Sequence, residues 1–140
     1  IGNPGILILD EPTAGLDPKE RIRIRNLISE VAKDKIVIIA THVVTDVEFI
    51  AKEIVMLSNG KIIRSGSPSK LLNELDGKVW NIFLSDNEID EVNTGYKVSN
   101  ISRDADGVIA RIIADSYDGR WQKEAVRPNL EDLYLYLNGD

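Results

Sequence analysis

The chain is poor in the residues that most often carry enzyme chemistry. Among its 140 residues there is no cysteine and only one histidine, and aromatic residues make up 6%. The lack of cysteine excludes disulfide bonds and fits a reducing compartment such as the cytoplasm. No apolar run approaches the roughly 20 residues that a bilayer-spanning helix needs, and no signal peptide is recognisable.

The chain also lacks an excess of positive charge. Its net charge is −6 and its pI is about 4.8, which argues against nucleic acid as a partner, because nucleic-acid binding needs a basic face. Apolar residues make up 43% of the sequence. A chain of this length and composition can bury about two thirds of its unfolded surface, as a globular protein does.

A glycine-rich phosphate-binding loop is missing as well. Such a loop ends in Gly-Lys-Ser/Thr at the start of a helix, so that backbone amides and the lysine hold the phosphates. The pair Gly60-Lys61 has neither the upstream glycine nor the following hydroxyl residue, and it belongs to a predicted hairpin turn at Asn59-Gly60.

The most informative segment is the run ILILDEPTAGLDP at residues 6–18. Four apolar residues followed by Asp10 and Glu11 are typical of a buried parallel strand that delivers two acids to a sheet edge. A bare run of this kind more often ends in solvated loop acids. The continuation through Gly15 and Asp17 favours function, although Asp17 also has a structural role as the predicted cap of the next helix.

A second buried strand is predicted at residues 36–40, IVIIA, with an amphipathic helix between the two strands. Strand, helix and strand in this order form a crossover unit whose strands run parallel. Glu11 and His42 therefore emerge at the same carboxyl edge of one sheet. A lone histidine is more often a capping or surface residue, but its place directly after a buried strand favours a site.

Residues 6–18 closely resemble the Walker B motif and D-loop of ABC-type ATPases, and residues 41–68 resemble the H-loop and the region that follows it. The signature LSGGQ and a Q-loop are absent, and the only glutamine is Gln122. In the family these parts precede Walker B. The resemblance, which covers residues 1–76, therefore implies the C-terminal part of an ABC ATPase subunit.

The resemblance implies a role for each matching residue and implies ATP and Mg²⁺ as cofactors of the intact subunit. Glu11 and His42 are the expected catalytic residues, one polarising the attacking water and the other contacting the γ-phosphate. Asp10, Gly15 and Asp17 are the expected nucleotide-site residues, with Asp10 as the ligand of Mg²⁺ and Asp17 at the interface with a partner subunit.

The expected fold class is α/β. Residues 1–77 would contribute part of a P-loop NTPase (RecA-like) parallel sheet with flanking helices. Residues 78–140 would form a small accessory α+β region with antiparallel strands and a last helix capped by Asn129. The terminal phrase AVRPNLEDLYLYL resembles the C-terminal helix of an exporter-type ABC subclass. No catalytic constellation is visible after residue 77.

The implied function is that of a cytoplasmic ATPase subunit, peripheral on the inner face of the cell membrane, that powers a membrane permease and pairs with a second ATPase subunit. Two alternatives stay open: an ABC ATPase that acts on DNA or ribosomes, and an interaction or regulatory module with vestigial acids. Without the missing motifs, we expect residues 1–140 alone to be inactive. We also expect them to self-associate, because the strands lose the cover that the whole domain supplies.

Overall fold

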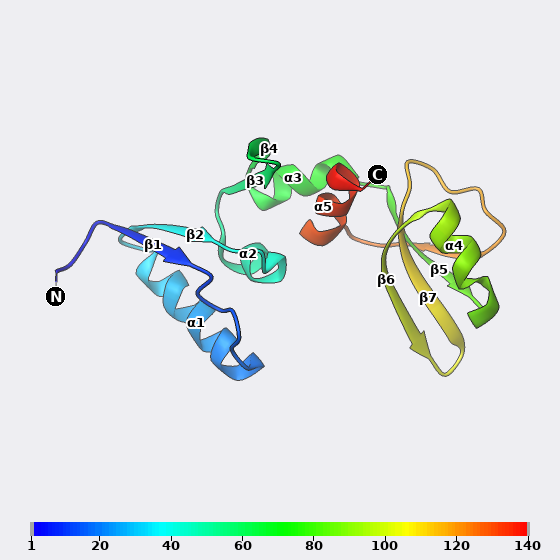
Figure 1. The fold of residues 1–140 in the computed structure, drawn as a ribbon, viewed down its shortest axis with the longest axis horizontal. Helices are drawn as coiled ribbons and strands as arrows, with labels where there is room; N and C mark the ends of the chain where they lie inside the picture. Colours follow the sequence, from blue (N-terminus) through cyan, green and yellow to red (C-terminus); the bar gives the residue numbers. More distant parts are fainter. Residues whose placement is uncertain (1, 140) are drawn as a thin grey trace. The chain divides into compact units, whose positions relative to one another are not determined.

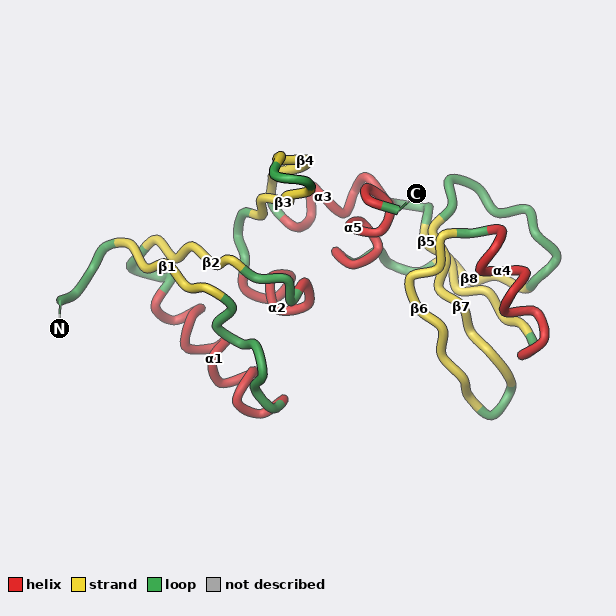
Figure 2. Tube along the Cα trace, in the orientation of Figure 1, coloured by secondary structure: helices red, strands yellow, loops and turns green. Residues whose placement is uncertain are grey.

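The computed structural model describes residues 2–139 (Figure 1). The chain divides into two compact units, residues 1–54 and residues 55–140. Both units contain helices and strands, so the fold is of mixed α/β type (Figure 2). No helix in the described part of the chain is long and apolar enough to cross a membrane.

The N-terminal unit is a strand-helix-strand motif followed by a short helix. Its elements are β1 (Ile6–Asp10), α1 (Pro18–Val31), β2 (Ile36–Ala40) and α2 (Val44–Ile50). The two strands pair in parallel, with a register that runs from Ile6 opposite Ile36 to Asp10 opposite Ala40. The predicted parallel pairing of residues 6–9 with residues 36–40 is thereby confirmed.

Local signals explain where α1 begins. Asp17 has an extended backbone and its Oδ1 accepts the backbone N–H of Glu20 at 3.0 Å, while Pro18 occupies the first turn. The proline needs no hydrogen-bond partner there, and its fixed φ suits a helix start. The predicted cap at Asp17 is confirmed, whereas the Glu20 side chain pairs with Arg23 along the helix.

The two strands of the N-terminal unit have one exposed apolar face. Along both strands exposed and half-buried residues alternate, and the exposed residues include Ile6 (56%), Ile8 (71%), Ile36 (60%) and Ile38 (52%). The expectation that these strands are buried holds for one face only. Parallel strands are normally covered on both faces, and a pair without a layer on its second side leaves every other residue exposed to water.

The C-terminal unit begins with a hairpin and a short helix. Strands β3 (Ile54–Ser58) and β4 (Lys61–Gly66) pair across the turn Asn59-Gly60. Both turn residues have positive φ, 50° and 74°, as the predicted two-residue turn requires. Helix α3 (Pro68–Leu72) follows and continues as a 3-10 turn to Leu75.

A four-stranded antiparallel sheet forms the centre of this unit, in the order β6-β7-β5-β8. The strands are β5 (Val79–Leu84), β6 (Lys97–Asp104), β7 (Gly107–Ile113) and β8 (Gln122–Ala125), and helix α4 (Ile89–Gly95) connects β5 to β6. The main hydrophobic core consists of buried side chains from strands β5 and β7, helix α4 and a loop: Ile82, Leu84, Val92, Val108, Ala110, Ile112 and Tyr117.

The last helix, α5 (Leu130–Asn138), is attached by a buried ion pair. Asp132 is fully buried and accepts from Arg111 Nη2 at 2.6 Å and from Ser99 Oγ at 2.7 Å. It also completes a capping box with Asn129, so the predicted cap is confirmed. Buried Leu130 and Leu133 add apolar contacts to this polar anchor.

The fold class agrees with the expectation only at its coarser level. The chain is mixed α/β, but three of the four strand pairs with a defined register are antiparallel, and two parallel strands are too few to define a RecA-like sheet. The compact units meet at residues 54 and 55, whereas the boundary predicted from the resemblance lies at residues 77 and 78. The predicted boundary marks where the sequence resemblance ends, not where a compact unit ends, and it stays a prediction.

Candidate functional site

Glu11 follows the last residue of β1 in an unusual backbone conformation. Its φ is +47°, a left-handed value that is uncommon for residues other than glycine, asparagine and aspartate. The Glu11 N–H donates to Ala40 O at 2.8 Å, which extends the contact between the strands by one residue. The chain therefore leaves the sheet abruptly, and the Glu11 side chain is placed beside the residues that follow β2.

Three groups after β2 donate hydrogen bonds to the Glu11 carboxylate. Oε1 accepts the backbone N–H of His42 at 3.1 Å and lies 2.7 Å from His42 Nδ1, while Oε2 accepts Thr41 Oγ1 at 3.0 Å. The two predicted catalytic residues, 31 positions apart in sequence, are thus in direct contact. Crossover topology explains this, because parallel strands end at the same edge.

These hydrogen bonds favour the charged form of Glu11. The hydrogen bond from the His42 ring lowers the pKa of Glu11 below its usual 4.5, with smaller contributions from Thr41 and the His42 backbone N–H, against a partly opposing desolvation. Glu11 is therefore ionised at neutral pH and can only accept hydrogen bonds. It follows that His42 Nδ1 carries a proton and that Nε2 is the ring nitrogen directed away from Glu11.

Both side chains remain accessible to a ligand. The side chain of His42 is 82% exposed and that of Glu11 is 34% exposed. An ionised carboxylate beside an exposed imidazole can polarise a water molecule and contact an anionic group at the same time. The arrangement can position a water molecule against a substrate that reaches the sheet edge from solvent.

The other three predicted site residues lie near this pair without bonding to it. Asp10 is the exposed last residue of β1, Gly15 has a φ of +74° in the following turn, and Asp17 is exposed and caps α1. Within residues 2–139, no hydrogen bond or ion pair joins any of them to Glu11 or His42. A side chain at position 15 would have open space but a strained backbone.

The described residues contain no cluster of three or more histidine, aspartate or glutamate side chains that could hold a metal ion. Mg²⁺ is usually bound through one or two carboxylates together with waters and substrate phosphates. The exposed carboxylate of Asp10 is a donor of the right type for such a shared site. The chemistry of this residue therefore fits Mg²⁺ only when phosphate oxygens complete the coordination.

Sequence reasoning missed a buried polar contact behind the Glu11–His42 pair. Thr13 Oγ1 donates to Asp46 Oδ2 at 2.5 Å, and the two residues are 1% and 2% exposed. Arg25 Nη1 lies 3.5 Å from Asp46 Oδ1. A usable signal was present, since Asp46 interrupts the otherwise apolar stripe of α2.

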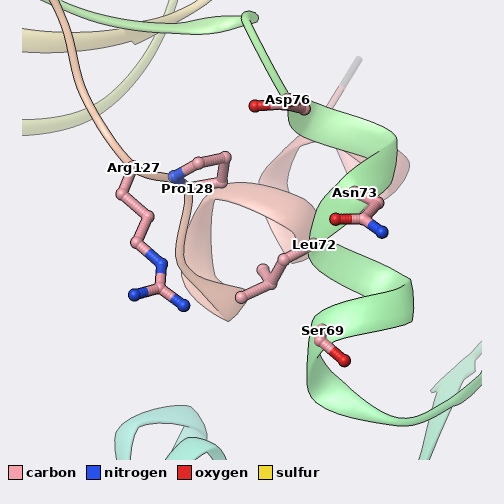
Figure 3. A pocket seen from close by; sticks show the side chains of 6 residues that line it. All are labelled: Ser69, Leu72, Asn73, Asp76, Arg127 and Pro128. Atoms are coloured by element: carbon pink, nitrogen blue, oxygen red, sulfur yellow. The ribbon is translucent and has the colours of Figure 1, made fainter.

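A small cleft in the C-terminal unit is a weaker candidate (Figure 3). Its volume is about 130 Å³, and it is lined by α3, the 3-10 turn and the segment before α5: Ser69, Leu72, Asn73, Asp76, Arg127 and Pro128. Ligand sites usually enclose about 300 Å³ or more. One arginine opposite one aspartate offers neither a nucleophile nor a paired acid and base, so the cleft is no candidate for catalysis.

Comparison with known proteins connects the chain to ABC transporter ATP-binding proteins. A putative ABC transporter ATP-binding protein of Methanosarcina acetivorans is 44% identical over 91 residues, or 64% of this chain. The energy-coupling factor transporter ATP-binding protein EcfA2 of Lactococcus lactis is 42% identical over 74 residues, or 52% of the chain. ABC transporter A family member 8 of Dictyostelium discoideum is 39% identical over 71 residues, or 51% of the chain.

The chain corresponds to only part of each of these relatives. The matched region covers 31% of the archaeal protein, 26% of EcfA2 and 8% of the Dictyostelium protein. No protein-family model matches the chain. The names of these relatives agree with the resemblance based on residues 6–18, whereas none of them specifies an exporter-type subclass.

Proposed function

We propose that the chain is part of an ABC transporter ATP-binding subunit. In that subunit it supplies the residues at the carboxyl edge of the sheet that take part in hydrolysis. The observation that carries the proposal is the contact between Glu11 and His42 at the carboxyl end of a parallel strand pair. Relatives named as ABC transporter ATP-binding proteins support ATP as the substrate. The names of these relatives also favour transport over an ABC ATPase that acts on DNA or ribosomes.

In this proposal the two contacting residues have different tasks. Glu11 accepts a proton of the attacking water and so orients it toward the γ-phosphate, because phosphoryl transfer depends mainly on positioning and charge stabilisation. His42 donates from Nε2 to a γ-phosphate oxygen while Nδ1 stays bonded to Glu11, so both ring nitrogens must carry a proton in this step. The short Nδ1 contact thereby couples the position of the phosphate to that of the water.

The remaining predicted residues complete the site around this pair. Asp10 would hold Mg²⁺, which neutralises charge on the phosphates when bound. Gly15 lets the turn after Glu11 pass close to the nucleotide, and Asp17 lies at the interface with a second ATPase subunit. Since Asp17 already caps α1, its role across the interface would be added to a structural one.

We propose a membrane permease and a second ATPase subunit as partners of the intact protein, with location at the inner face of the cell membrane. An exporter-type subclass remains part of the proposal and rests on residues 125–137 alone. A RecA-like sheet would likewise include β1 and β2 as neighbours. It would place its further strands or helices against Ile6, Ile8, Ile36 and Ile38, the exposed residues of this pair.

The proposal is tested by Glu11→Gln in the intact protein, assayed for phosphate release from ATP. The amide keeps the shape of the side chain but is a much weaker acceptor for the water proton. We expect kcat to fall by about 10²- to 10⁴-fold while nucleotide binding survives. Glu30→Gln is the matched control, because Glu30 is exposed on α1 and, within residues 2–139, its side chain pairs with Lys33 alone.

Two further results bear on the same proposal. His42→Ala should also lower turnover and weaken nucleotide binding to some extent, since a phosphate contact is removed. Residues 1–140 alone should show no ATPase activity and no micromolar Mg-ATP binding by calorimetry, because they lack phosphate-binding amides and the lysine. Unchanged turnover in Glu11→Gln would refute the role assigned to Glu11.

A further inference from the structure

The buried pair Thr13 and Asp46 joins the two loops that carry Glu11 and His42. Thr13 lies two residues after Glu11, and Asp46 lies four residues after His42 in the first turn of α2. The 2.5 Å hydrogen bond between their side chains is buried, and neither residue touches the Glu11 carboxylate. The pair therefore links the segment that follows Glu11 to the helix that follows His42.

The backbone conformation of Glu11 indicates what the hydrogen bond between Thr13 and Asp46 does. A glutamate in the left-handed region is strained, and such a conformation persists only where the surroundings hold it from several directions. On one side, the Glu11 N–H is bonded to Ala40 O. On the other side, the turn is closed by Ala14 N–H donating to Glu11 O at 3.2 Å. Thr13, inside that turn, is bonded to α2.

The second partner of Asp46 stabilises its charge. Arg25 on α1 lies 3.5 Å from Oδ1 and stacks on Phe49 of α2, with its guanidinium 4.6 Å from the ring centroid. Within residues 2–139, Oδ1 has no hydrogen-bond partner. The Thr13 hydroxyl is therefore the one hydrogen-bond donor to this carboxylate in that part of the chain, and a buried carboxylate depends strongly on such a donor.

We propose that Thr13 and Asp46 are positioning residues, whose buried bond holds the turn after β1 against α2 and so keeps Glu11 in contact with His42. The inference rests on the proposed function for its relevance to catalysis, but the positioning itself is a property of residues 1–54. Thr13→Val removes the hydroxyl at nearly constant volume. Asp46→Asn weakens the same bond at constant shape.

His42 provides a specific readout because it is the only histidine. Its ring ¹⁵N signals report the hydrogen bond from Nδ1 to Glu11, and Glu11→Gln supplies the spectrum with that carboxylate removed. In residues 1–140 we expect Thr13→Val to move both ring signals at least halfway toward those of Glu11→Gln. Thr13→Ser, which keeps the hydroxyl, should retain the wild-type signals, as should Thr45→Val, which changes an exposed threonine next to Asp46.

Wild-type ring signals in a folded Thr13→Val chain would overturn the proposal, because the bond would then stabilise the unit without placing Glu11. Circular dichroism establishes folding. If Thr13→Val unfolds, Asp46→Asn takes its place with the same expected shift. Unfolding of both variants would also overturn the proposal, since the pair would then support the whole unit rather than one turn.

The intact protein separates this inference from the proposed function. There we expect Thr13→Val to lower kcat about 10- to 100-fold with the KM for ATP changed less than about twofold, the pattern of a misplaced catalytic group. If Glu11→Gln leaves turnover unchanged, the proposed function fails while the His42 spectra still decide the positioning. If Glu11→Gln is inactive and Thr13→Val is fully active, the positioning role fails alone.

Discussion

The two units of the chain differ in what they contain: one has the candidate site, and the other has most of the buried apolar side chains. Among residues 2–139, the buried apolar side chains of the N-terminal unit are Ile28 and Ile54, whereas the C-terminal unit has a continuous core around its four-stranded sheet. The contacting pair Glu11 and His42 lies in the N-terminal unit. The unit that contains the proposed active residues thus has few buried apolar side chains.

Each unit also contains a buried polar contact, and the two contacts connect different parts of the structure. In the C-terminal unit the buried ion pair between Arg111 and Asp132 attaches a helix to a sheet. In the N-terminal unit the buried pair Thr13 and Asp46 links two loops at the candidate site. A buried polar group must be satisfied in either case, but only the second pair lies within a few residues of Glu11 and His42 in sequence.

The largest expected effect is on the free energy of unfolding. It is seen when an isoleucine is replaced by alanine in each of the two units. Ile82→Ala removes a fully buried side chain from the C-terminal core and should lower the free energy of unfolding by about 2 to 5 kcal/mol. Ile8→Ala alters a side chain that is 71% exposed and should change it by less than about 0.5 kcal/mol in the monomer, at concentrations below those at which the chain dimerises.

Urea unfolding measures this contrast with separate probes. Both tryptophans, Trp80 and Trp121, belong to the C-terminal unit and report its unfolding by fluorescence. Far-ultraviolet circular dichroism follows the whole chain. Equal losses in Ile8→Ala and Ile82→Ala would contradict the contrast between an open and a closed unit.

The second prediction concerns the exposed face of β1 and β2. An uncovered apolar face beside an open sheet edge favours pairing with another chain. We expect residues 1–140 to form a two-fold dimer at micromolar concentration, with an interface distinct from the ATP-bound dimer of ABC ATPases. Ile8→Lys should raise the dissociation constant at least about tenfold, which is about 1.4 kcal/mol.

Sedimentation over a range of concentrations tests the dimer. Ile62→Lys is the matched control, because Ile62 is 66% exposed and belongs to β4 rather than to β1 or β2. A monomer at all concentrations would contradict self-association. Equal weakening by Ile8→Lys and Ile62→Lys would show that a different surface is used.

The smallest expected effect is a dependence of stability on pH that differs between the units. Hydrogen bonds from the backbone N–H and the hydroxyl of Ser85 lower the pKa of Glu88 from 4.5 to about 2. Because the pKa is lower in the folded state, this contribution is complete well above pH 4.5 and is lost as the pH falls toward 2. Glu11 acts in the same direction, with a pKa lowered chiefly by His42.

Unfolding curves between pH 7 and pH 2 check this prediction. Glu88→Gln should reduce the loss of stability on acidification as seen by tryptophan fluorescence, and Glu11→Gln should do so only for the N-terminal unit. Both side chains are accessible, so solvent screening keeps each effect modest. If neither substitution changes the loss of stability on acidification, other carboxylates are responsible for that loss.

Much of the local structure and part of the site could be predicted from sequence. Turn and cap positions at Asn59-Gly60, Asp17 and Asn129 follow from the short-range preferences of these residues. The contact of Glu11 with His42 was also predictable, since strand, helix and strand in succession force both strand ends to one edge. The roles of Asp10, Gly15 and Asp17 remain predictions, because no contact in the structure tests them.

The amino-acid sequence by itself determined the positions of strands and helices and the motif residues at the carboxyl edge, because those signals operate over a few neighbouring residues. Only the tertiary structure decided that Thr13 bonds to Asp46, that Arg111 meets Asp132, and that the C-terminal strands take the order β6-β7-β5-β8. The two side-chain pairings join residues 33 and 21 positions apart, and many partners compete at such separations. Packing selects among them by burying apolar area while satisfying each buried polar group.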